Sequence, residues 1–137
     1  MQTTTTLHSQ TQVEMETVSP NIYVRDLDQT ISFYRLLGFE IITRFPEDKP
    51  IFVLMQCGSI CFMFQTFESI GNTLPAVSRN DGASLLLYIK VKGVRRLFER
   101  ISNSVTIING LERTFYGATE FSILDNNNYM LTFAEDE

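Results

Sequence analysis

The first organised stretch of the chain changes from the period of a strand to the period of a helix. Apolar side chains occupy every second position from 18 to 24, as in a half-buried strand. Leu27, Ile31 and Tyr34 then follow at helical spacing and form one apolar stripe. A second strand is predicted directly afterwards, at 39–45. The pattern therefore predicts a strand, a helix and a strand in immediate succession.

Both ends of this helix carry terminal signals. Asp26 is suited to accept a hydrogen bond from the first turn, and Gln29 three positions later fits a capping box. Gly38 directly follows the last residue of the apolar pattern and is suited to the left-handed conformation that ends many helices. We therefore expect the helix to lie between Asp26 and Gly38.

Two further strands complete this first unit. The prolines of the segment 46–50 predict a loop, because proline has no backbone N–H to donate to a neighbouring strand within a sheet. Strands at 51–56 and 60–65 then form a hairpin around Cys57, Gly58 and Ser59. The first unit is therefore βαβββ.

The second half of the chain repeats this unit at an offset of 67 residues, which places Val91 on Val24 and Val94 on Leu27. A strand at 85–91 is followed by a helical stripe and by strands at 105–111, 118–124 and 129–134. The sequence thus predicts an α+β fold of two βαβββ modules with curved mixed sheets, in which each helix covers the outer face of its sheet. The expected organisation is a flexible tail at 1–17 and a single domain at 18–135, divided into module one at 18–66, a connector at 67–83 and module two at 84–135.

Composition limits the function further. With 137 residues and 44% hydrophobic residues, the chain can form one domain with a buried core. The net charge of −5 argues against nucleic acid as a partner. No apolar run is long enough to span a membrane and no secretory signal is present, so we expect a cytoplasmic protein. Its two cysteines, Cys57 and Cys61, are expected to be buried free thiols.

Two motifs resemble those of a known superfamily. The run NIYVRDLDQTISFYRLLGFE at 21–40 is similar to the opening motif of the vicinal oxygen chelate superfamily, which includes glyoxalase, bleomycin-resistance proteins and extradiol dioxygenases. The run YGATEFSILDNNNYMLTFAE at 116–135 resembles its closing motif. The resemblance implies that paired modules form a cup, within one chain or across a homodimer, and that a ligand lies in the cup.

Metal-dependent members of that superfamily hold a divalent ion with histidine and carboxylate ligands. The corresponding positions here are Ser19, Leu86 and Thr132, with a fourth near Phe62, and none is a credible ligand. The one histidine, His8, lies in the predicted tail. We therefore expect no metal and no cofactor.

The alternation of each strand predicts which side chains face the cup. The ligand-binding residues predicted in this way are apolar or aromatic, with a few polar groups: Asn21, Tyr23, Phe62, Phe64, Leu86, Tyr88, Met130 and Thr132. An alternative is that the aromatic side chains only fill the space between the two sheets.

Glu120 is the one candidate catalytic residue, because a carboxylate in an aromatic pocket can act as a general base or bind a cation. It can instead be a rim residue paired with Arg113 or Arg44. The arginines at 95, 96 and 100 are interpreted as a solvated helix face. The favoured function is metal-free binding of a small hydrophobic or aromatic molecule by a homodimer. The alternatives are a cofactor-free isomerase or lyase and a ligand-sensing or interaction domain, so whether the protein is an enzyme stays open.

Overall fold

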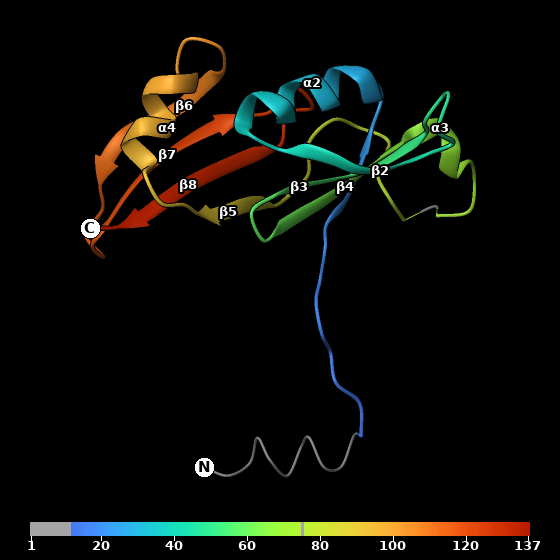
Figure 1. Cartoon of the computed structure of the whole chain (residues 1–137), viewed down its shortest axis with the longest axis horizontal. Helices are drawn as coiled ribbons and strands as arrows, with labels where there is room; N and C mark the ends of the chain where they lie inside the picture. Colours follow the sequence, from blue (N-terminus) through green and yellow to red (C-terminus); the bar gives the residue numbers. More distant parts are fainter. Residues whose placement is uncertain (1–11, 75) are drawn as a thin grey trace.

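The computed structural model describes residues 12–74 and 76–137, and it contains two four-stranded sheets, each with a helix against one face (Figure 1). The predicted α+β class is confirmed. The elements in chain order are β1 (Asn21–Val24), α2 (Leu27–Leu37), β2 (Glu40–Phe45), β3 (Phe52–Cys57), β4 (Ile60–Thr66), α3 (Phe67–Ile70), β5 (Leu86–Lys90), α4 (Val94–Ile101), β6 (Thr106–Arg113), β7 (Ala118–Leu124) and β8 (Met130–Asp136). Most of the predicted tail, including His8, lies outside the described residues.

The two sheets have the same topology. The first has the strand order β1-β4-β3-β2 and the second has the order β5-β8-β7-β6. In each sheet the first strand pairs in parallel with the last strand of its module, and the other pairs are antiparallel. The helices α2 and α4 begin at Leu27 and Val94, which agrees with the predicted offset of 67 residues. No helix in the described part of the chain is long and apolar enough to cross a membrane.

The helix α2 begins and ends where its sequence predicts. The Asp26 carboxylate accepts a hydrogen bond from the backbone N–H of Gln29 at 3.0 Å. Gly38 adopts a φ of +111°, and its N–H bonds back to the carbonyls of Tyr34 and Arg35. The apolar stripe that includes Leu27 is buried against the first sheet, so local signals set the ends of this helix and packing on the sheet sets its position.

Two of the side chains predicted to face the cup lie instead beneath α2. The parallel register of β1 and β4 sets Phe64 opposite Ile22, and side chains at paired positions share one face of a sheet. Phe62 and Phe64 are 4% and 0% exposed, and their rings lie 5.8 and 4.6 Å from the ring of Tyr34. The prediction that these phenylalanines line the cup is therefore wrong. The inner face of β4 carries Met63 and Gln65.

A buried polar contact joins the two modules. The hydroxyl of Tyr34, in α2, donates to the carboxylate of Asp125 in the β7–β8 turn at 2.6 Å. The same carboxylate accepts the backbone N–H groups of Asn127 and Tyr129 at 2.8 and 2.9 Å. Burial raises the pKa of Asp125, while these three hydrogen bonds act in the opposite direction. Each module therefore holds part of the other in place through groups that water does not reach.

Candidate functional site

The inner face of a sheet is defined here as the face opposite its helix. On the first sheet this face carries a polar cluster around Asn21. The side-chain amide of Asn21 donates to Tyr23 Oη at 3.3 Å and to Gln65 Oε1 at 3.2 Å, and Gln65 in turn donates to Ser69 at 3.0 Å. The Asn21 Oδ1 atom is buried and has no hydrogen-bond partner in the described structure. An unsatisfied buried acceptor costs about 1–3 kcal/mol, so this position favours a hydrogen-bond donor.

On the second sheet, the inner face combines exposed apolar groups with acidic side chains, among them Glu120. Leu86 and Tyr88 are each 46% exposed. Glu120 Oε2 accepts the hydroxyl of Tyr88 at 3.0 Å and the hydroxyl of Tyr116 at 2.7 Å. The hydrogen bond to Glu120 is the main reason that the pKa of Tyr116 is raised to about 12. The predicted residues Leu86, Tyr88 and Glu120 therefore lie on one face of the sheet, and Tyr88 is the one that contacts Glu120. Tyr116 was not predicted.

A second carboxylate lies next to this cluster. Glu112 in β6 is directly opposite Glu120 in β7. Neither carboxylate has an ion pair in the described part of the chain, and Arg113 donates instead to the backbone carbonyl of Glu137. Like charges at opposed positions repel, so a positively charged group at this place is electrostatically favoured.

The remaining predicted residues of the second sheet lie on this same face, next to Leu86 and Tyr88. Thr132 is paired with Tyr88 in the parallel ladder, and Met130 is paired with Leu86. Thr132 is only 3% exposed, and its hydroxyl shares a hydrogen bond of 2.7 Å with Ser122. Its polar group is therefore already satisfied.

The two sheets approach each other where β5 passes the start of β4, and side chains from both faces of each sheet reach this junction. A shallow pocket of about 280 Å³ lies at this junction, and its lining residues are Val18, Pro20, Ser59, Ile60, Cys61, Phe62, Leu87, Tyr88 and Ile89. Tyr88 therefore belongs both to this pocket and to the cluster around Glu120. A molecule bound on the second sheet can extend toward the first.

The residues at the superfamily's metal positions do not fit a metal. Leu86 offers no donor atom, Phe62 lies in the core, and the Thr132 hydroxyl is bonded to Ser122. In the described part of the chain, no three histidine, cysteine or acidic side chains lie close enough together to hold an ion. We therefore derive no chemistry from a metal.

The fold is that of a protein with two βαβββ modules, and the comparison with family models agrees. The chain belongs to the Glyoxalase/Bleomycin resistance protein/Dioxygenase superfamily, whose model matches residues 14–133. The resemblance inferred from its two motifs is thereby confirmed.

Similar solved structures cover nearly the whole chain. A protein of unknown function from Agrobacterium tumefaciens is 29% identical, with a TM-score of 0.75 over 91% of this chain and 97% of its own. A family enzyme from Burkholderia phytofirmans is 25% identical, with a TM-score of 0.71 over 87% and 97%. The bleomycin resistance determinant encoded on transposon Tn5 shares the fold at 20% identity, with a TM-score of 0.66 over 90% and 99%. A comparison with curated proteins gives no significant match.

Proposed function

We propose that this protein binds a small hydrophobic or aromatic molecule that carries a positive charge, and that it does so without a metal. The observation that carries the proposal is the position of Glu120. This carboxylate is held by two tyrosine hydroxyls, on the same face as the exposed side chains of Leu86 and Tyr88 and opposite Glu112, and no lysine or arginine among the described residues forms an ion pair with it.

Each part of this surface has a complementary part in such a ligand. An ammonium group can pair with the carboxylate of Glu120 and also approach the faces of the tyrosine rings, an attraction of about 0.5–2 kcal/mol. Leu86 supplies apolar area for the rest of the molecule. The bleomycin resistance determinant of Tn5 shares this fold.

We also propose that the functional unit is a homodimer. Leu85 and Leu86 are 51% and 46% exposed on the β5 segment, which is an edge of the second sheet. Exposed apolar side chains at a sheet edge favour pairing with another chain. A symmetry mate would cover this edge and close the inner faces into a cup.

Matched ligands test the binding proposal. We would titrate the wild-type protein by calorimetry with 2-naphthylmethylamine and with 2-naphthylmethanol, which differ in charge but little in shape. The amine should bind about tenfold more tightly. Glu120→Gln should remove this preference and leave binding of the alcohol unchanged. Glu47→Gln changes an exposed carboxylate of the β2–β3 loop and should have no effect.

Equal binding of the amine and the alcohol by the wild-type protein would overturn the proposal. The same variant tests the alternative that the protein is a cofactor-free enzyme. If Glu120→Gln binds the amine as well as the wild type does but abolishes its chemical conversion, the carboxylate is a catalytic base and the protein is an enzyme.

A further inference from the structure

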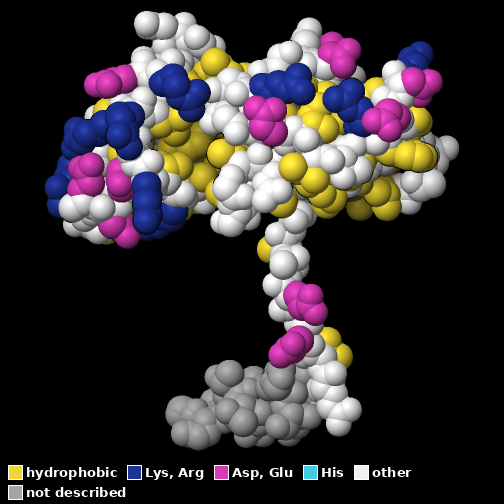
Figure 2. Space-filling model, viewed as in Figure 1, with side chains coloured by type: hydrophobic (Ala, Val, Ile, Leu, Met, Phe, Trp, Pro, Cys, Tyr) yellow, Lys and Arg dark blue, Asp and Glu magenta, His cyan; other side chains and the backbone are white. Residues whose placement is uncertain are grey.

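A larger cavity lies on the opposite side of the sheets from the inner faces. It has a volume of about 660 Å³ and lies between the β3–β4 hairpin of module one and the β5–α4 connection of module two. Figure 2 shows hydrophobic side chains at the bottom of a hollow in this region, with lysine and arginine side chains around it. The volume is in the range typical of small-molecule sites.

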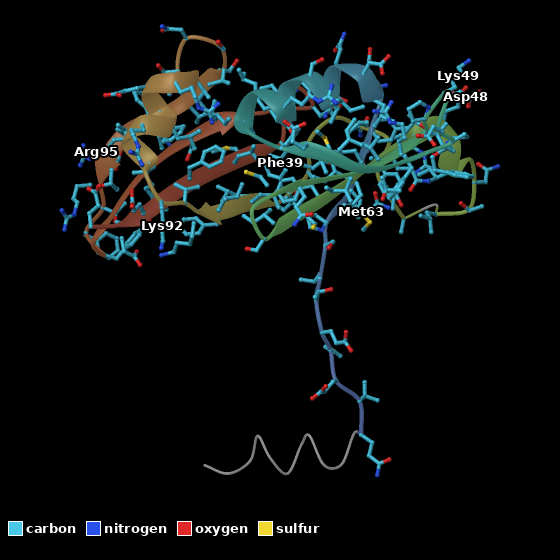
Figure 3. The ribbon with its side chains drawn as sticks, in the orientation of Figure 1. Phe39, Asp48, Lys49, Met63, Lys92 and Arg95 are labelled. Carbon is cyan, nitrogen blue, oxygen red and sulfur yellow. The ribbon has the colours of Figure 1, made fainter. Side chains whose placement is uncertain are left out.

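The walls of this cavity are apolar and rigid. Leu37 and Phe39 come from the end of α2 and the residue before β2, while Ile89 and Phe133 come from β5 and β8. All four are less than 8% exposed and belong to the common core of the two modules. Figure 3 labels Phe39 near the centre of the molecule and Lys92 on the side of module two. The walls therefore hold their shape without a ligand.

The rim of the cavity is basic. In a chain of net charge −5, its lining residues include Lys90, Lys92, Arg96 and Arg100 but no aspartate or glutamate. Lys90 pairs with Asp136 at 2.8 Å, and Arg100 donates to the carbonyl of Leu36 at 2.9 Å. Lys92 and Arg96 have neither an ion pair nor a hydrogen bond in the described part of the chain. Two cations are thus free to bind a ligand.

The backbone at Gly93 leaves room for one of these cations. Gly93 has a φ of +84°, and a Cβ there would lie 2.9 Å from Nη2 of Arg96. The guanidinium of Arg96 therefore lies directly over Gly93, at the mouth of the cavity. The N–H groups of Gly93 and Val94 are already bonded to Glu135 at 3.0 Å, so the arginine rather than the helix terminus is available to an anion.

We propose that this cavity binds an amphipathic anion, a molecule with an aliphatic tail and a carboxylate or phosphate head. The tail lies between the apolar walls, and the head pairs with Arg96 and Lys92. A guanidinium binds either head group through two parallel hydrogen bonds. This site differs from the inner faces in its position and in the sign of the charge that it favours.

Ligands that share one aliphatic tail and differ only in their head group test the proposal. Calorimetry with decanoate and decyl phosphate should show binding of at least one of them, and decanol should bind at least tenfold more weakly. Arg96→Gln and Lys92→Gln should each weaken binding of the anion several-fold. Arg95→Gln is the matched control on the same helix, because Arg95 pairs with Glu137 and does not line the cavity. Binding that is equal for decanol, or unchanged in both cavity variants, would overturn the proposal.

The two cysteines report the location of the bound anion. Cys57 lines this cavity, whereas Cys61 lines the pocket at the inner faces, and both are free. Saturating anion should slow alkylation of Cys57 by iodoacetamide and leave the rate at Cys61 unchanged, as read by peptide mass spectrometry. Protection of Cys61 alone would place the ligand elsewhere and refute the assignment. Glu120→Gln should not alter either result, so this test is independent of the proposed function.

Discussion

The contact between Tyr34 and Asp125 allows the loss of stability in a Tyr34→Phe variant to be predicted. Tyr34 is 0% exposed and Asp125 is 4% exposed, and their hydrogen bond of 2.6 Å joins the two modules. Tyr34→Phe removes only the hydroxyl and leaves one carboxylate oxygen of Asp125 buried without its donor. Hydrogen bonds to charged groups contribute about 1.5–3 kcal/mol, so we expect the free energy of unfolding to fall by roughly that amount.

Urea denaturation followed by far-ultraviolet circular dichroism measures this loss. Tyr129→Phe is the matched control, since its hydroxyl has no hydrogen bond in the described part of the chain, and it should cost less than about 0.5 kcal/mol. A double-mutant cycle isolates the contact. In the Asp125→Asn background the lost hydrogen bond is neutral, and Tyr34→Phe should then cost about 1 kcal/mol.

The stability cost of Tyr34→Phe should change with pH in a definite direction. Burial raises the pKa of Asp125 in the folded protein above its usual value of 3.8. The protonated Asp125 side chain therefore stabilises the folded state fully below pH 3.8. This stabilisation is lost as the pH rises through the pKa of Asp125 in the folded protein. Tyr34→Phe removes an interaction that lowers this pKa, so the pKa rises further. The cost of the variant should therefore shrink on acidification toward pH 3.8. An equal cost in both backgrounds and at every pH would refute the reasoning.

Four other predictions concern the site and the assembly. Protein purified without chelator should contain no stoichiometric divalent ion by elemental analysis, and EDTA should leave the Tm unchanged; one zinc or manganese per chain would contradict this. Light scattering should give twice the monomer mass of 15.7 kDa, and the monomer mass across micromolar concentrations would refute the dimer. Glu120→Gln should lower the pKa of Tyr116 from about 12 toward its usual value of 10.0 in an absorbance titration, and an unchanged curve would mean that the hydrogen bond is absent in solution. Phe62→Ala should destabilise the protein by about 3–5 kcal/mol in urea denaturation, because this ring lies in the core, and a change in ligand affinity without loss of stability would restore its place in the cup.

Much of the fold could be predicted because its signals are local. The caps at Asp26 and Gly38 and the alternation of β1 depend only on neighbours in the sequence. The offset that relates Leu27 to Val94 is also visible in the sequence alone. The repeat then determines the order of elements in module two once module one is understood.

Which side chains of β4 face the helix could not be predicted in the same way. Cys61, Phe62, Met63 and Phe64 are all apolar, so alternation does not say which pair faces the helix. The register with β1 decides the question, and register is a contact between distant segments.

The site depends on such distant contacts too. Tyr116 shares the parity of Glu120 in its own segment, which was a usable signal, but its hydrogen bond also involves the orientation of a turn. The interpretation of Arg96 and Arg100 as a solvated face also changed. Each lies on the exposed side of α4 and at the same time borders a cavity that exists only once the two modules are packed together.

A crystal structure of the protein with bound 2-naphthylmethylamine tests the central claim most directly. The account predicts that the ammonium group lies within hydrogen-bond distance of the Glu120 carboxylate, that the aromatic ring contacts Tyr88 and Leu86, and that no metal ion lies beside it. An amine bound away from the inner face, or one held through a metal ion, would contradict the account.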